Sequence, residues 1–166
     1  FMKQRGLADI INSTPAVLAP PIAWTTSKSF QEYTEQNTSG RKPYLFVGTN
    51  DGVLHALDIE AMGTGANVEK WGYVPRSLLS QVRHHYPMPE IIVGSTSYWL
   101  GDEPENGLYK QMFLMDGSPV AEDVLMARDM SPFAVDEGYQ WRAVVFGGVG
   151  KGARTYYALD VSNTVK

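Results

Sequence analysis

The most distinctive polar side chains in the sequence are Asn50, Asp51 and His55, which flank a glycine in the segment 49–55. An imidazole and a carboxylate this close together are residue types that bind ligands, transfer protons or contact partners. The same residues also suit a tight turn, because Asp51 can accept from nearby backbone N–H groups and Gly52 can adopt positive φ. A strand histidine between apolar neighbours can donate to a carbonyl oxygen. We favour the turn over a binding site.

Two other groups of side chains have the chemistry of metal ligands but not the spacing. An EF-hand-type calcium loop alternates oxygen ligands around a central glycine and ends in a glutamate, and no segment has this pattern. Asp102, Glu103 and Glu105 are therefore expected in a solvated loop. His84 and His85 end an expected helix, where cations are favoured, and no third and fourth zinc ligands are apparent. We expect no metal site.

The glycine-rich segment Gly147–Gly152 has the composition of a phosphate-binding loop. Such a loop must lead into a helix, whereas residues 154–161 have a strand pattern and no Ser or Thr follows Lys151. A hairpin connection is expected instead. The chain also lacks cysteine and a G-x-S-x-G motif, and the adjacent Glu122 and Asp123 would point to opposite faces of a strand. The sequence predicts no catalytic residue.

The composition is that of a globular protein, with 166 residues of which 43% are apolar and 19% charged. A net charge of −4 and a pI near 5.3 argue against a nucleic-acid-binding protein. The absence of cysteine excludes a disulfide scaffold, a Cys-ligated zinc site and an iron–sulfur cluster. No apolar run approaches the roughly 18–20 residues that span a bilayer, so no membrane span is predicted.

The elements that position these residues are expected to be short strands joined by turns. Residues 1–40 are expected to form a loop-rich lead-in, with a short helix or a linker at 27–40. Trp71 and Trp141 are expected in the core, whereas Tyr98 and Trp99 lie beside the acidic loop and are the best candidates for a partner contact. Strands are expected at 44–47, 53–57, 69–74, 90–95, 108–115, 122–127, 141–146 and 155–161, with a helix at 76–86 and a hairpin turn at Asp116 and Gly117.

A pattern recurs along the chain. The run 46–48, a glycine-containing turn and Ala56-Leu57-Asp58 recur as 145–147, a glycine turn and Ala158-Leu159-Asp160. Repeated antiparallel meanders indicate a mainly all-β fold that forms part of a β-propeller with one short inserted helix. Since closed propellers need about four or more blades, residues 41–166 are expected to form two to three blades of an incomplete propeller, with an insertion near 87–112.

Five segments form an ordered set of motifs: LADIINSTP at 7–15, VGTNDGVLHALD at 47–58, YVPR at 73–76, MDGSP at 115–119 followed by Asp123, and the stretch 141–161. In this order they resemble the C-terminal domain of the type IV pilus tip-associated proteins, the PilC/PilY family of adhesins and biogenesis factors. Ala8 stands where the family usually has glycine. The stretch from Tyr86 to Met112 departs from the family pattern and looks inserted.

The resemblance implies a modified quinoprotein-like propeller, exported to the periplasm, outer surface and pilus tip of a Gram-negative bacterium. It implies a non-enzymatic role in pilus assembly and extension, adhesion and motility, through contacts with minor pilins and with host or other surface ligands. The family's calcium site is expected downstream of Lys166, so no cofactor is expected within this chain. The motif residues expected to be structural are Asn50, Asp51, Gly52, His55, Asp58, Asp116, Gly117 and Asp160.

Two alternatives stay open. A quinoprotein-like dehydrogenase is one, because the Ala-Leu-Asp strand followed by Thr64-Gly65 and Trp71 resembles the repeat of those enzymes. The sequence shows no recognisable cofactor or calcium ligands and no vicinal cysteine pair, and a quinone absorbance spectrum would separate the two. A structural propeller of unknown role is the other, which unchanged pili after gene deletion would favour.

Overall fold

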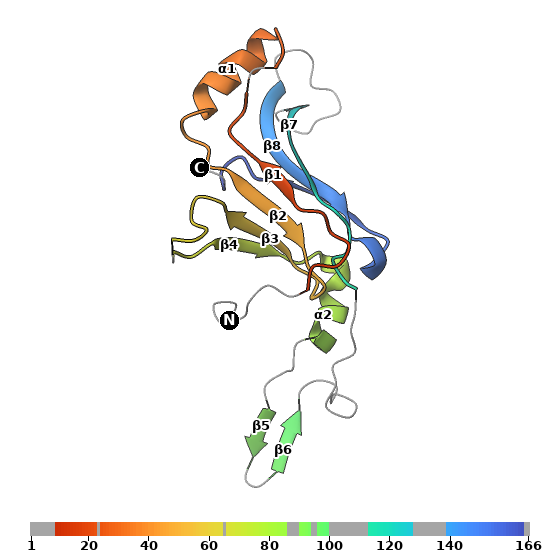
Figure 1. Ribbon diagram of the computed structural model, residues 1–166. Coiled ribbons are helices and arrows are strands. Elements are labelled where there is room, and N and C mark those ends of the chain that lie inside the picture. The colour runs from red at the N-terminus through yellow and green to blue at the C-terminus, as the bar shows by residue number, and fades with distance from the viewer. Residues whose placement is uncertain are drawn as a thin grey trace.

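The computed structural model describes residues 9–22, 24–64, 66–85, 90–93, 96–99, 113–127 and 139–164. Within these residues, strands form three antiparallel sheets, accompanied by two α-helices and short 3-10 turns. The expected mainly-β fold class is confirmed. Figure 1 shows two larger sheets side by side, with a separate hairpin at one end of the molecule.

The first sheet is a four-stranded meander, the unit from which propeller blades are built. It contains β1 (Ala16–Leu18), β2 (Tyr44–Gly48), β3 (Leu54–Asp58) and β4 (Glu69–Tyr73) in that order. Apolar and aromatic residues give β2 its strand preference, and Gly52 closes the following turn at φ 92° with its N–H 3.0 Å from the Thr49 carbonyl. The expected lead-in contributes β1; the domain division at residue 41 stays a prediction.

The other large sheet has the order β7 (Val120–Ala127), β8 (Tyr139–Gly148), β9 (Tyr156–Asp160). The expected strand at 108–115 is wrong in its described part, 113–115, and residues 108–112 lie outside the described residues. The hairpin turn expected at Asp116 and Gly117 is also wrong. Met115 N–H instead donates to Thr49 O at 3.3 Å and Asp116 N–H to Val149 O at 2.9 Å, so this segment is held between two loops.

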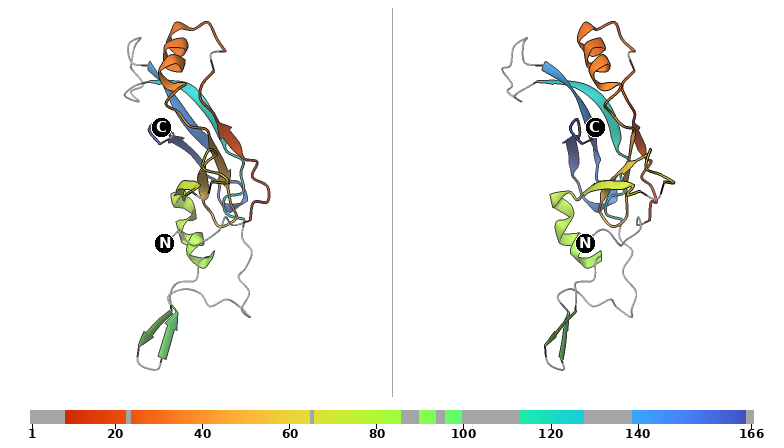
Figure 2. Two further views of the ribbon diagram at one scale, coloured as in Figure 1. Left: turned by 60° about the vertical axis from the view of Figure 1, so that its left-hand side comes forward. Right: turned by 90° about the vertical axis from the view of Figure 1, so that its left-hand side faces the viewer.

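Helices cap both ends of the sheets (Figure 1). Either a short helix or a linker is expected at 27–40, and the structure has a helix there. This helix, α1 (Lys28–Asn37), is anchored by the buried Phe30. The helix expected at 76–86 begins as the 3-10 turn η2 (Arg76–Leu78) and continues as α2 (Leu79–His85). Beyond α2, strands β5 (Glu90–Val93) and β6 (Thr96–Trp99) pair as a hairpin that lies apart from both large sheets in Figures 1 and 2.

The two large sheets share one hydrophobic core, and the views in Figure 2 place β1 alongside β7. Trp71 packs at the edge of this core with its ring 5.8 Å from that of Phe46. Trp141, which was also expected in the core, packs elsewhere: its ring lies 4.6 Å from that of Phe30 on α1. The core is built from both sheets and the loops between them: Leu18, Tyr44, Phe46, Leu54, Ala56, Leu78, Leu114, Met115, Ala143, Val145, Val149, Tyr157 and Val161.

The sequence repeat corresponds to two hairpins whose registers differ by one residue. Ala56 pairs with the buried Phe46 and is itself buried. Ala158, its counterpart in the repeat, pairs with Phe146 on a solvent-exposed face. A shift of one residue moves a side chain to the opposite face of a sheet, so the repeated Ala-Leu-Asp does not occupy equivalent positions.

Candidate functional site

The polar residues of the turn between β2 and β3 form a buried network. His55 Nδ1 lies 2.8 Å from Glu69 Oε1, and its Nε2 lies 3.0 Å from Thr49 Oγ1, which donates to Asp51 Oδ1. The order hydroxyl, imidazole, carboxylate is that of a hydrolase triad. However, Thr49 has no exposed surface, so its hydroxyl cannot meet a substrate. The backbone N–H of the buried Asn50 donates to Asp9 O at 3.0 Å. The geometry favours the turn interpretation.

Asp58 at the end of β3 also organises a turn. Its Oδ1 accepts from the backbone N–H groups of Glu60 and Ala61 at 3.0 and 3.2 Å, and Lys70 Nζ lies 3.3 Å from Oδ2. Burial alone would raise the pKa of Asp58, but the hydrogen bonds from Lys70 and Ala61 and the lysine charge outweigh it, so the pKa is lowered. The charged form is therefore the one that stabilises the fold.

Segments from four motifs meet in one place. We call this the junction; it consists of residues 12–14, 48–49, 114–118 and 148–152. The Asp116 carboxylate accepts from Asn12 Nδ2 at 2.8 and 3.0 Å, and Ser13 Oγ accepts from Gly48 N–H at 3.0 Å. The junction thus uses Asp116 to tie the lead-in to the connection between the two sheets.

Glycines let the backbones of the junction approach closely. A Cβ on Gly117 would stand 2.0 Å from Gly148 O, and one on Gly152 would stand 2.0 Å from Leu114 O. Gly150 adopts φ 82°. The loop then enters the three-residue turn η4 (Gly150–Gly152) and β9, which agrees with the hairpin connection expected for it. Close backbone packing accounts for Gly150 and Gly152, because a Cβ on either residue would clash with backbone atoms of the segment 114–117.

Asp160 ends β9 beside Arg142, with which it forms an ion pair. Its Oδ1 also accepts from Ser162 N–H at 3.0 Å. Burial alone would raise the pKa of Asp160, whereas the hydrogen bonds from Ser162 and Arg142 and the charge of Arg142 outweigh it and lower the pKa. Arg142 is thereby held in place on β8.

A buried ion pair that the sequence does not reveal links β7 to the loop after α1. Arg41 is 6% exposed; its Nη1 and Nη2 donate to the two oxygens of Asp123 at 2.6 and 2.9 Å. Tyr33 OH donates to the same carboxylate at 2.8 Å. Burial and the contact with Asp123 raise the pKa of Tyr33 well above 10.0. The only hint in the sequence is that Asp123 follows the fourth motif.

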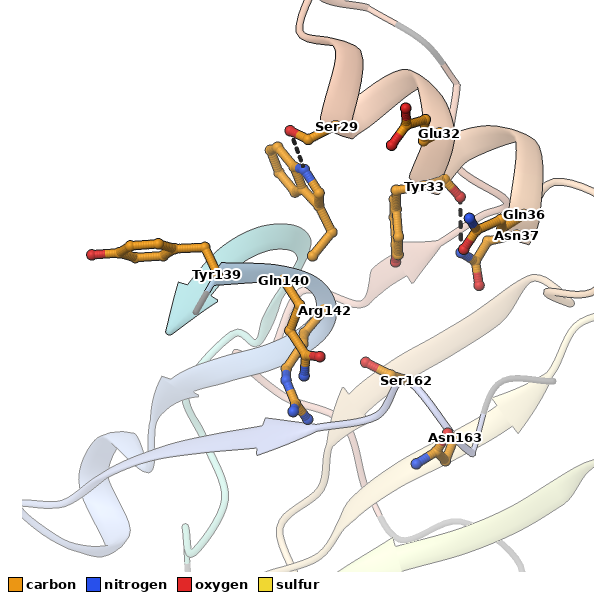
Figure 3. A pocket seen from close by; sticks show the side chains of 11 residues that line it. Ser29, Glu32, Tyr33, Gln36, Asn37, Tyr139, Gln140, Arg142, Ser162 and Asn163 are labelled. Carbon is orange, nitrogen blue, oxygen red and sulfur yellow. Dashed lines mark hydrogen bonds between the residues drawn. The ribbon is translucent and has the colours of Figure 1, made fainter. Parts of the chain in front are cut away.

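Directly beside this ion pair, an open groove of about 670 Å³ lies between α1 and β8. Figure 3 shows Glu32, Tyr33 and Gln36 on α1 across from Gln140 and Arg142 on β8 and from Ser162 and Asn163 after β9. The Trp141 indole N–H donates to Ser29 Oγ at 3.2 Å and so joins β8 to α1 beside the groove. We take this groove as the candidate functional site. It is lined by Ser29, Glu32, Tyr33, Gln36, Asn37, Tyr139, Gln140, Trp141, Arg142, Ser162 and Asn163.

The groove contains none of the residues selected from the sequence as a partner contact. Tyr98 and Trp99 belong to β6, far from α1 in Figure 1, and their side chains lie outside the described part of the chain, so their role stays a prediction. Asp102, Glu103 and Glu105 lie outside the described residues altogether. Amide side chains scattered over three elements carry no sequence pattern, so the groove could not be found from the sequence.

Two described meander sheets with a shared core and a glycine-packed junction define a propeller-type scaffold. The family model for the "PilY1 beta-propeller domain" matches residues 7–165, and the chain belongs to this family. The expected resemblance is therefore confirmed.

Curated relatives extend the likeness over nearly the whole chain. Two proteins of Xylella fastidiosa named "Type IV pilus biogenesis factor PilY1 homolog" have 26% and 30% sequence identity with this chain, in alignments that cover 95% of its length. The "Type IV pilus biogenesis factor PilY1" of Pseudomonas aeruginosa is 27% identical over 96% of it. The matched region covers only 9–12% of these relatives' own lengths. No solved structure matches the chain.

Two further findings concern the described residues alone. No helix among them is long and apolar enough to cross a membrane. In the same part of the chain, no cluster of three or more His, Cys, Asp or Glu side chains is arranged to hold a metal ion.

Proposed function

We propose that this chain is a non-enzymatic propeller segment of an exported, type IV pilus-associated protein that supports pilus assembly and extension at the pilus tip. The observation that carries the proposal is the family match over residues 7–165, supported by relatives named as pilus biogenesis factors. The scaffold supports it as well: the motif residues are engaged in turns and sheet contacts, which suits a rigid support for binding loops. Adhesion and motility follow from the same role.

The proposed mechanism is protein–protein contact with minor pilins, with Tyr98 and Trp99 on the β5–β6 hairpin as the anchor. Tyrosine and tryptophan are frequent at the centres of such interfaces. The hairpin is set apart from both large sheets (Figures 1 and 2), so a partner could reach it without disturbing the core. The family's calcium site downstream of Lys166 remains part of the proposal.

The test is a pull-down of purified minor pilins with the full-length protein and with a Tyr98→Ala/Trp99→Ala variant. Tyr156→Ala is the matched control, because Tyr156 is an 88% exposed aromatic on β9. We expect binding by the wild type and the control and loss in the double variant. Binding by all three would move the contact elsewhere, and no binding by folded wild-type protein would refute the minor-pilin partner.

The biogenesis role is tested separately in the source bacterium. Deleting the gene should abolish surface pili, and the full-length gene should restore them. Unchanged pili in the deletion strain would refute the role and favour a structural propeller. A quinone absorbance band in the purified protein would instead support the dehydrogenase alternative, which no observation among the described residues favours.

A further inference from the structure

The groove between α1 and β8 presents hydrogen-bonding groups that the fold does not use. Gln36 on α1 and Asn163 after β9 are exposed, and neither side-chain amide makes a hydrogen bond to another described residue. Figure 3 shows them on opposite sides of the groove. Asn37 commits only its Nδ2, to Tyr33 O at 2.8 Å. Each amide offers a donor beside an acceptor, which matches a hydroxyl group that both donates and accepts.

The charged groups of the groove, in contrast, are already paired. Arg142 contacts Asp160, and its remaining guanidinium N–H groups face the Gln140 amide, whose oxygen accepts from them when suitably oriented. Glu32 lies 3.8 Å from Lys28. No lining residue offers an uncommitted cation to a phosphate or carboxylate, so the groove suits a neutral ligand.

The inner wall is aromatic, and the lining contains no aliphatic side chain. The rings of Tyr33 and Trp141 lie 6.2 Å apart at 31°, and Tyr139 extends outward at the rim (Figure 3). A peptide that anchors through an apolar side chain would find no matching pocket here. A sugar ring, which has a flat C–H face and a rim of hydroxyls, matches an aromatic wall edged by amides.

We propose that this groove binds a neutral carbohydrate of about two sugar rings, a size that fits a volume near 670 Å³. The rings of Tyr33 and Trp141 form the stacking wall, and Gln36, Asn37 and Asn163 contact the hydroxyls. This site goes beyond the role in pilus biogenesis, because none of its unused amides belongs to the junction or the sheets.

The experiment is ligand-observed NMR titration of the full-length protein with maltose, cellobiose, lactose and diacetylchitobiose as probes. The test variant is Gln36→Ala/Asn163→Ala, in which both changed side chains are exposed. Asn67→Ala is the matched control, since Asn67 is an exposed amide in the loop before β4, away from the groove lining. We expect at least one probe to bind, with about tenfold or greater weakening in the double variant and no change in the control.

Two results would overturn the inference: no probe binds the folded wild-type protein, or binding of the probe survives unchanged in the double variant. Strains of the source bacterium that carry the double variant or the control variant are also scored for surface pili. Loss of sugar binding with normal pili supports the groove as a separate site. Loss of pili in the double variant, with sugar binding unchanged, would assign these amides to pilus assembly and refute the sugar site.

Discussion

Replacing Gly117 with alanine should open the junction. The new Cβ would stand 2.0 Å from Gly148 O and 2.9 Å from its carbonyl carbon, whereas ordinary contacts begin near 3.4 Å. Both clashing atoms are backbone, so the two segments must separate by roughly 1.4 Å, the difference between 3.4 and 2.0 Å, to reach ordinary contact. That separation breaks the bonds from Asp116 and Gly117 N–H to Val149 O, which are 2.9 and 3.2 Å long. Two hydrogen bonds and the steric strain together amount to about 2–4 kcal/mol.

Hydrogen exchange read by mass spectrometry measures this loss locally, so it works in the full-length protein. A change of 2–4 kcal/mol corresponds to exchange about 30- to 800-fold faster in peptides covering 114–118 and 148–152. Gly40→Ala is the matched control, because a Cβ there has no neighbour within 4 Å and the backbone φ is not positive. Exchange in the Gly117 variant within about threefold of the control would refute the close-packing argument.

Three further predictions use the same measurement. Arg41→Met should leave the largely buried Asp123 carboxylate without its counter-charge, with only the Tyr33 hydroxyl still donating to it. This should destabilise β7 by about 3–5 kcal/mol, and unchanged exchange in β7 would contradict this. The pKa of Asp58 in the folded protein lies below its ordinary value of 3.8. The charged Asp58 side chain therefore stabilises the fold fully above pH 3.8, and this contribution is lost as the pH falls through the folded pKa. In Asp58→Asn, stability should depend less on pH below about pH 4, and a pH profile identical to that of the wild type would contradict the role of Asp58. Trp141→Ala should lower the local stability of α1 by about 1–3 kcal/mol and leave the exchange of β2 unchanged. An equal loss of stability in α1 and β2 would show that Trp141 belongs to the main hydrophobic core.

The strands of the first sheet could be predicted because their signals are local. An aromatic and β-branched run, a turn ending in Gly52, and a second apolar run specify β2 and β3 within a few residues. For the same reason, the sequence alone was enough to assign Asp51 and His55 to a turn. The repeated meanders ending in Ala-Leu-Asp already indicated part of a β-propeller, and the family resemblance added that the propeller is a modified, quinoprotein-like one.

Contacts between distant segments had no such signal. Arg41 and Asp123 are 82 residues apart, and neither lies in an arrangement that marks it as buried. The strand expected at 108–115 failed in its described part for a related reason. Leu114 and Met115 are apolar and suit a strand by composition. However, the Met115 N–H donates to Thr49 O, and the N–H groups of Asp116 and Gly117 donate to Val149 O, so tertiary contacts replace strand pairing.

The distribution of motifs also separates scaffold from binding chemistry. Asp116, Gly117 and the glycine loop all take part in the junction. There the Asp116 carboxylate accepts a hydrogen bond from Asn12, and the glycines let the backbones approach closely. Gln36 and Asn163, which remain available to a ligand, stand outside all five motif segments. A shared fold carries different functions through residues added to it. Relatives that keep the motifs are therefore expected to keep the junction, while the ligand preference of the α1–β8 groove can differ from one relative to the next.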